Sequence, residues 1–231
     1  MTNVMIRQPG YLPNIGFFKK IQSCDLFVYL DDAQFVKDRF DNRNKIRTID
    51  GYRWLTVPVK RPVFSKKINE IDISYDTNWQ KEHCDLIFEN YHKTKYFSSY
   101  WNSIKKIIDK KHEKLIDLNI NLIQFINSEL KISTEIFSSS DLNISETKTK
   151  KLVSICSRVN ATCYISGISG RDYLDEQLFS DAKIKLIYEN FIHPKYDQLY
   201  GNFLENMSVI DLLFNMGEQS VEILSKCKNF D

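Results

Sequence analysis

The chain has 231 residues, of which 42% are hydrophobic, and its 32 Lys or Arg and 30 Asp or Glu leave a net charge of +2. With 15 Phe and 12 Tyr, it has ample material for a packed core, so a folded chain is expected rather than an intrinsically disordered one. The near balance of charge argues against dedicated binding of nucleic acid or of an anionic membrane.

Several simple features place the protein in a broad class. The N-terminus MTNVMIRQPGYLP lacks a long apolar run, and no stretch of eighteen apolar residues occurs, so we expect a soluble, cytoplasmic protein without a membrane span. The five cysteines are odd in number, scattered, and form no C-x-x-C pair. Disulfides and a zinc site are therefore not expected.

The N-terminal third begins with a strand, loop, helix and strand. Val4 to Arg7 is short and apolar, QPGYLPNIG (8–16) is rich in Pro and Gly, FFKKIQS (17–23) is helical, and LFVYLDD (26–32) is again strand-like. Such a unit closes with parallel strands and places the first loop at the carboxyl edge of the sheet, where ligands of open α/β sheets bind.

The middle of the chain changes character twice. WLTVPVK (54–60) and INEIDIS (68–74) look like a pair of strands. Apolar residues then recur at helical spacing over residues 79–130, which predicts two or three helices. The lysine-rich run at 104–114 is interrupted by acids and apolar residues and is typical of a solvated helix face.

The C-terminal part returns to α/β alternation. We expect strands in TEIFSSS (134–140), TCYISGISG (162–170) and IKLIYEN (184–190), and a helix opened by Ser145 between the first two. A last helix, MSVIDLLFNMG, has Ser208 as N-cap and ends at Gly217. The pattern predicts one α/β domain over residues 1–231, Rossmann-like, with a mostly parallel sheet, a helical insertion at about 79–130 and a site formed by strand-end loops.

The first candidate site is the loop Gln8 to Gly16. Its prolines and glycines can hold a preshaped turn that displays Gln8 and Tyr11 and presents backbone N–H groups at the start of a helix. This geometry suits a phosphate or a carboxylate. The alternative is a structural connection that binds nothing.

The second candidate spans Asp31 to Asn44. Asp31 and Asp32 follow a predicted buried strand and could accept a proton or coordinate a metal. Polar side chains crowd the loop behind them and could bind substrate, with Arg43 able to pair with a phosphate: Gln34, Asn42, Arg43 and Asn44. Alternatively, one of the aspartates only caps the next segment.

Two further candidates lie in the C-terminal part. SGISGRDYLD (166–175) provides Ser166 and places Arg171 in the first turn of a helix, as in an anion cradle, although it matches neither G-x-G-x-x-G nor the Walker pattern. His193, at a strand end, is the best general-base candidate, because His83, His92 and His112 lie in helical runs where we expect surface positions. No cysteine has a histidine at an informative spacing, and none is expected to be a nucleophile.

Taken in order, these stretches resemble a known family. The pattern QPxYLPxxGFFxKI, LFVYLDDxQF, NRNKI, WLTVPV, SGxxGRDYLD, HPxYxQ and SxIDLLFNxG covers nearly the whole chain and is similar to the WbqC-like proteins. The resemblance points to the residues already named and adds Pro9, Pro13, Gly16, Gly167, Gly170, Tyr196 and Gln198. One departure stands out, since members usually carry a histidine where this chain has Arg7.

What the resemblance implies is a role in bacterial surface-glycan gene clusters, such as those of O-antigen and capsule. Our preferred hypothesis is a transferase that adds an N-acyl or aminoacyl group, for example glycyl, to a nucleotide-linked amino sugar. His193 or one of Asp31 and Asp32 would accept the amine proton, while Arg43 and Arg171 would hold phosphates. The donor would be a thioester of coenzyme A or of an acyl carrier protein, or an adenylate made from ATP.

Two other hypotheses stay open. A nucleotidyltransferase-like enzyme would use ATP and Mg²⁺ held by Asp31 or Asp32. A non-catalytic subunit would bind the sugar nucleotide and deliver it to a partner enzyme. The aromatic residues Tyr96, Phe97 and Trp101 fit either the face of a homo-oligomer or core packing.

Overall fold

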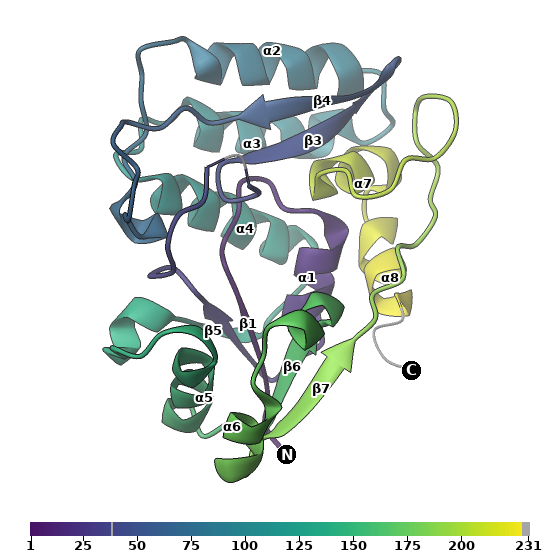
Figure 1. Ribbon diagram of the computed structural model, residues 1–231. Coiled ribbons are helices and arrows are strands. Elements are labelled where there is room, and N and C mark those ends of the chain that lie inside the picture. The colour runs from purple at the N-terminus through teal and green to yellow at the C-terminus, as the bar shows by residue number, and fades with distance from the viewer. Residues whose placement is uncertain (38, 228–231) are drawn as a thin grey trace.

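A five-stranded parallel sheet forms the base of the molecule. The computed structural model describes residues 1–37 and 39–227 (Figure 1). The strands are β1 (Asn3–Arg7), β2 (Leu26–Tyr29), β5 (Glu135–Ser138), β6 (Cys163–Gly167) and β7 (Lys185–Glu189), in the order β5-β2-β1-β6-β7. Every pair in this sheet is parallel, with Val4 opposite Leu26 and Tyr164. The predicted Rossmann-like α/β class is confirmed.

Both faces of the sheet are covered, as parallel sheets require. Side chains alternate along a strand, so Val4 and Ile6 pack with one group of buried residues and Met5 with another. The first group includes helices α5 (Lys148–Arg158) and α6 (Glu176–Asp181), and the second includes α1 (Ile15–Gln22) and α8 (Gln219–Lys226). The central strands are thereby fixed from both sides.

The hairpin and the helical insertion lie beyond the carboxyl ends of the sheet strands (Figure 1). The hairpin consists of β3 (Arg43–Thr48) and β4 (Gly51–Thr56), paired antiparallel. Three helices follow it: α2 (Trp79–Tyr91), α3 (Phe97–Asp109) and α4 (Leu115–Glu129). Phe97 and Trp101 are buried in the core around these helices, so core packing, not a free face, accounts for them.

The predicted pairing of 54–60 with 68–74 is confirmed only in part. Val59 and Ile73 form an antiparallel bridge, flanked by hydrogen bonds from the Lys60 N–H to Asp72 and from the Ser74 N–H to Pro58, but the segments do not pair over their whole length. The first residues of 54–60 belong to β4, which pairs with β3, a strand that begins inside the expected loop 31–44, and Ile68–Glu70 forms a 3-10 helix, η1. A further isolated bridge joins Asp72 to Lys114. The sequence RNKIRT hides β3 because most of its side chains are polar, and cross-strand contacts with the aromatic residues of β4 support the pairing.

The C-terminal half matches the expected order with shifted helix starts. α5 begins after Thr147, not at Ser145. The segment with Arg171 is a 3-10 helix, η3 (Ile168–Asp172), and α6 begins only after Asp175. A further 3-10 helix, η2 (Ser139–Leu142), follows β5. In α7 (Val209–Met216) the predicted caps are confirmed, since Ser208 accepts a hydrogen bond from the Ile210 N–H and Gly217 ends the helix at a φ of 56°.

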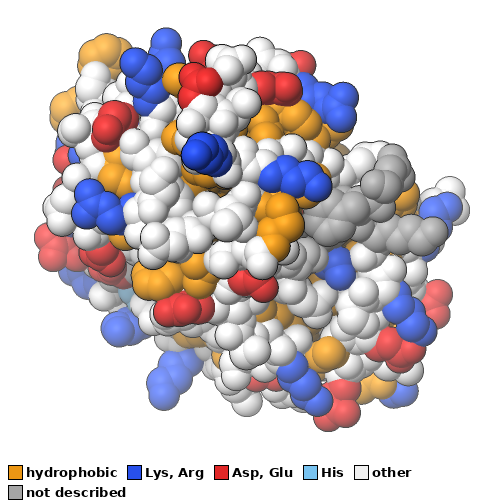
Figure 2. Space-filling model, turned by 90° about the horizontal axis from the view of Figure 1, so that it is seen from below, with side chains coloured by type: hydrophobic (Ala, Val, Ile, Leu, Met, Phe, Trp, Pro, Cys, Tyr) orange, Lys and Arg blue, Asp and Glu red, His pale blue; other side chains and the backbone are white. Residues whose placement is uncertain are grey.

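Neither a membrane-spanning helix nor a disulfide occurs among the residues that the structure describes. Among the described helices, none has the length and apolar character needed to cross a membrane. All five cysteines are buried free thiols. Figure 2 shows side chains of both charges scattered over the face seen from below, so no continuous patch of one sign covers it.

Candidate functional site

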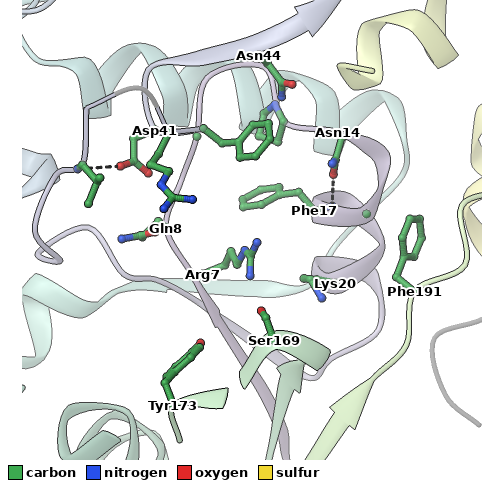
Figure 3. Close-up of a pocket in the computed structure, with 16 residues that line it drawn as sticks. Arg7, Gln8, Asn14, Phe17, Lys20, Asp41, Asn44, Ser169, Tyr173 and Phe191 are labelled. Atoms are coloured by element: carbon green, nitrogen blue, oxygen red, sulfur yellow. Dashed lines mark hydrogen bonds between the residues drawn. The ribbon is translucent and has the colours of Figure 1, made fainter. Parts of the chain in front are cut away.

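The main cleft lies at the point where the order of the sheet reverses. From β1 the chain moves to β2 and β5 on one side, and later to β6 and β7 on the other. In open α/β sheets, ligands bind beyond the carboxyl ends of the strands at such a switch point. A cleft of about 630 Å³ opens there (Figure 3), within the size range of small-molecule sites.

Two loops that form the cleft are locked together. The Tyr11 N–H donates to the Phe40 carbonyl at 3.2 Å, and a Cβ on Gly10 would lie 2.5 Å from that same oxygen. Only glycine allows this approach. From α4, the buried Asn119 amide donates to the carbonyls of Pro9 (3.1 Å) and Asp41 (2.8 Å). The loop after β1 is therefore held against the loop that carries Asp41.

Three cations line the cleft: Arg7 at the end of β1, Lys20 on α1, and Arg39. A Cβ on Gly167, at the end of β6, would lie 3.8 Å from Lys20 Nζ and 3.9 Å from Arg7 Nη1. The two cationic groups thus gather at one point, as Figure 3 shows. Such a group of cations at a strand edge attracts an anion.

The ammonium group of Lys20 is ion-paired with Glu189, the last residue of β7, and both side chains are largely buried. Burial, with the neighbouring Arg7, lowers the pKa of Lys20 to about 7. The Glu189 carboxylate acts in the opposite direction because it stabilises the ammonium. Lys20 thus contributes to the charge of the cleft by an ammonium group that burial and Arg7 disfavour and Glu189 favours.

Asp41 is the carboxylate of the cleft and faces it from above in Figure 3. Its side chain is 5% exposed and accepts a hydrogen bond from the Val36 N–H at 3.4 Å. Burial raises the pKa of Asp41 to about 6, although Arg7 and Arg39 pull it down. A carboxylate with a pKa near neutral pH is suited to accept and return a proton.

Uncharged side chains complete the cleft. Gln8 points into it, and its amide forms no hydrogen bond with the residues that the structure describes. Phe17 and Phe191 supply apolar surface, while Phe40 and Tyr173, 54% and 66% exposed, stand at its opening. Aromatic faces next to cations suit a ligand with both a ring and a phosphate.

Of the residues predicted for the first loop, Gln8 lies in the cleft, whereas the expected display of Tyr11 is wrong. Tyr11 is fully buried, and its hydroxyl shares a 3.0 Å hydrogen bond with His83 Nδ1. The expected surface positions of His83 and His112 are also wrong, since both are buried. Burial lowers the pKa of His83 to about 4, so this residue is neutral near pH 7.

Asp31 and Asp32 are held by protein donors outside the cleft. Asp31 accepts hydrogen bonds from the Ser139 hydroxyl, the Ser140 N–H and hydroxyl, and the Asn69 amide. Asp32 accepts from Ser139 and is ion-paired with Lys151. Burial raises the pKa of Asp32, but the bonds from Lys151 and Ser139 outweigh it and lower the value. All four carboxylate oxygens have a protein partner.

The other residues of this segment are divided between the cleft and the hairpin. Asn44 lines the cleft, with its amide donating to the Leu12 carbonyl at 2.7 Å. Asn42 donates to the Val57 carbonyl at 2.8 Å. The Arg43 guanidinium lies 4.4 Å from the Trp54 ring centroid, and Gln34 is exposed.

The candidate stretch 166–175 contributes Ser169 and Tyr173 to the cleft, but the side chains selected from the C-terminal part lie outside its lining. Ser166 is buried and donates to the Gly167 carbonyl at 3.2 Å. Arg171 lies over the Tyr188 ring at 4.9 Å. His193 Nδ1 is 2.8 Å from the Pro194 carbonyl oxygen, and burial lowers its pKa. Tyr196 and Gln198 both donate to Asp211 Oδ2 at 2.8 Å.

Sequence reasoning missed most of the charged residues of the cleft. Arg7 was noted only as a departure from a family pattern, and Lys20, Arg39 and Asp41 were not selected. A signal existed for Arg7, because it is the last residue of the first strand and so lies at the carboxyl edge of the sheet. Asp41 lay inside the second candidate stretch but carried no signal of burial.

The comparisons with known proteins agree with the family resemblance. The profile of the WbqC-like protein family matches residues 8–223, and the chain belongs to this family. It is also 36% identical over 231 residues to the uncharacterized protein Rv1507c of Mycobacterium tuberculosis, which covers 99% of this chain and 100% of that protein. No solved structure matches the chain.

Proposed function

We propose that this protein is a transferase of bacterial surface-glycan biosynthesis that adds an N-acyl or aminoacyl group to a nucleotide-linked amino sugar. The observation that carries the proposal is the cleft at the sheet switch point, which is lined by three cations and by a carboxylate with a pKa of about 6. The membership of the chain in the WbqC-like family supports the glycan context.

The cations account for recognition of the nucleotide. The diphosphate of a sugar nucleotide carries two negative charges, and Arg7, Lys20 and Arg39 provide charge-assisted donors for it. The apolar and aromatic side chains at Phe17, Phe191 and Tyr173 then accommodate the base or the sugar ring. Lys20 already has Glu189 as a counter-ion, so binding of an uncharged sugar alone would leave Arg7 and Arg39 without a phosphate partner.

The carboxylate accounts for the chemistry. The sugar amine attacks the acyl carbon of a thioester, so a C–N bond forms and the C–S bond breaks. Asp41 accepts the proton that the nitrogen loses and returns it to the departing thiolate, which leaves as a thiol. The free amide of Gln8 is positioned in the cleft to donate to the oxyanion of the tetrahedral intermediate.

The test is an acyl-transfer assay read by mass spectrometry, with UDP-glucosamine and nucleotide-linked 4-amino sugars as acceptors and acetyl- and glycyl-thioesters as donors. The Asp41→Asn variant is expected to lower turnover by about 10²- to 10⁴-fold. Asp85→Asn, an exposed carboxylate on α2, serves as the matched control and should retain the wild-type rate.

Two results would contradict the proposal. Turnover that survives Asp41→Asn would remove the assigned base. Tight binding of the sugar nucleotide without an acylated product from any donor would instead indicate a non-catalytic subunit that delivers the sugar nucleotide to another enzyme.

A further inference from the structure

The outer face of the β3–β4 hairpin carries a continuous surface of rings and cations. We call Phe40, Arg43, Lys45, Tyr52 and Trp54 the hairpin surface. Arg43 lies 4.4 Å from the Trp54 ring, and Lys45 lies 4.4 Å from the Tyr52 ring and 5.1 Å from the Trp54 ring. Trp54 also contacts Phe40 and Tyr52, with ring centroids 6.0 and 6.3 Å apart. These contacts connect all five side chains.

The register of the hairpin explains why these residues share a face. Lys45 is paired with Trp54, and Arg43 and Tyr52 are each two residues along the same strands. Alternation along a strand places such positions on one side and Arg53, between Tyr52 and Trp54, on the other. The hairpin therefore separates a ring-and-cation face from the face that contributes Ile46 and Leu55 to the core.

The charge of this region is strongly positive although the chain is nearly neutral. The two hairpin strands contain four Lys or Arg and no carboxylate. Residues 36–67 contain ten Lys or Arg against three Asp, whereas the net charge of the whole chain is only +2. Exposed rings beside cations are the chemistry that binds a base together with its phosphates.

The hairpin surface is continuous with the cleft. Phe40 contacts Trp54 on one side and lines the cleft on the other, next to Arg39 and Asp41. Phe40 and Tyr52 are 54% and 48% exposed, so both rings are accessible. A ligand held on the hairpin can therefore extend an arm past Phe40 toward Asp41.

We infer that the hairpin surface binds the 3′-phosphorylated ADP part of a coenzyme A thioester, the acyl donor of the proposed reaction. Its adenine stacks on the exposed rings, and Lys45 pairs with its phosphates. The pantetheine arm runs past Phe40 and brings the thioester to the amine beside Asp41. The assignment rests on the proposed function, because a thioester donor is what that reaction needs.

Calorimetric titration of the full-length protein with coenzyme A tests the inference. Lys45→Ala and Tyr52→Ala are each expected to raise the Kd for coenzyme A about tenfold, since each removes a phosphate partner or a stacking ring. Dephospho-coenzyme A, which lacks the 3′-phosphate, should bind more weakly than coenzyme A to the wild type. Arg53→Ala is the matched control, a cation of the same strand on the opposite face, and should bind as the wild type does.

Other outcomes would overturn the inference, and they can be told apart from a failure of the proposed function. Equal coenzyme A affinity in the wild type, Lys45→Ala and Tyr52→Ala would place the ligand elsewhere. If the wild type does not bind coenzyme A but binds an acidic carrier protein bearing the same thioester, the inference about the hairpin surface is refuted, whereas the proposed acyl transfer still stands. Titration with UDP-glucose reports on the cleft alone, so Lys45→Ala and Tyr52→Ala should leave its Kd unchanged. The melting temperatures of the two variants check that both are folded.

Discussion

Lys20 and Glu189 form an ion pair that joins helix α1 to the end of strand β7 at the carboxyl edge of the sheet. The carboxylate is 2% exposed, so it depends on this ammonium for compensation. The pair also fixes the position of a cation in the cleft beside Arg7. Stability and anion binding thus share one side chain.

The first prediction concerns the loss of this pair. Lys20→Met leaves the Glu189 carboxylate buried without its counter-ion, and breaking a buried pair in this way costs about 3–5 kcal/mol of unfolding free energy. Adding Glu189→Gln should restore much of that loss, because the remaining amide is neutral. Urea unfolding of the two variants and the wild type measures both effects, and a fully stable Lys20→Met protein would contradict the description of the pair.

The second prediction follows from the raised pKa of Asp41. Between pH 4 and about 6 the folded protein holds a proton that the unfolded chain releases, so this group favours the fold at low pH and the benefit is lost as pH rises through about 6. A rise in the pKa from the ordinary value of an aspartate to about 6 corresponds to about 3 kcal/mol. The unfolding free energy of Asp41→Asn relative to the wild type should rise by about that amount from pH 4 to pH 7. A difference independent of pH would show that Asp41 has an ordinary pKa.

The third prediction compares two glycines of the first loop. A methyl group on Gly10 would meet the Phe40 carbonyl oxygen at 2.5 Å, which belongs to the backbone and cannot yield without moving the loop. A methyl group on Gly16 would meet the Phe191 ring at 3.1 Å and Asn14 Oδ1 at 3.4 Å, which are side-chain atoms that can shift. We expect Gly10→Ala to destabilise the protein by about 1–3 kcal/mol and Gly16→Ala by less. Thermal unfolding of both variants checks the order, and the reverse order would refute the loop contact.

The fourth prediction assigns a structural role to the polar residues around Asp211. This carboxylate is fully buried and accepts hydrogen bonds from Tyr91, Tyr196 and Gln198. Asp211→Ala leaves three donors without their acceptor and should cost about 3 kcal/mol or more. Tyr196→Phe removes one bond and should cost about 1 kcal/mol while leaving the affinity for UDP-glucose unchanged. A loss of affinity in Tyr196→Phe would instead support the sequence prediction that this residue binds substrate.

The sequence was sufficient for the sheet, because its strands are apolar runs separated by turn and helix signals. It also indicated the loop after β1 correctly as a wall of the cleft, with Gln8 inside it. The sequence did not predict the β3–β4 hairpin, because the strand Arg43–Thr48 is mostly polar. Its pairing depends on contacts between Lys45 and the rings of Tyr52 and Trp54, which no local pattern records.

Polar residues at strand ends misled the prediction for a related reason. Asp31 looks available in the sequence, yet its partner Ser139 lies 108 residues away and occupies it in the fold. Lys20 is the opposite case. In the sequence it looks like an ordinary surface residue of a helix, and it lines the cleft only because α1 packs beside β7. Whether a polar side chain is occupied or available depends on tertiary contacts.

The most direct measurement is calorimetric titration of UDP-glucose, whose charge is constant near neutral pH, into the wild type, Arg7→Ala, Arg39→Ala and the control Arg158→Ala. Arg158 is exposed at the end of α5, outside the cleft. Loss of one charge-assisted contact should raise the Kd about 10- to 100-fold in Arg7→Ala and Arg39→Ala, and leave Arg158→Ala unchanged. Equal affinity in all four proteins would contradict the central claim that the cations of this cleft bind the nucleotide.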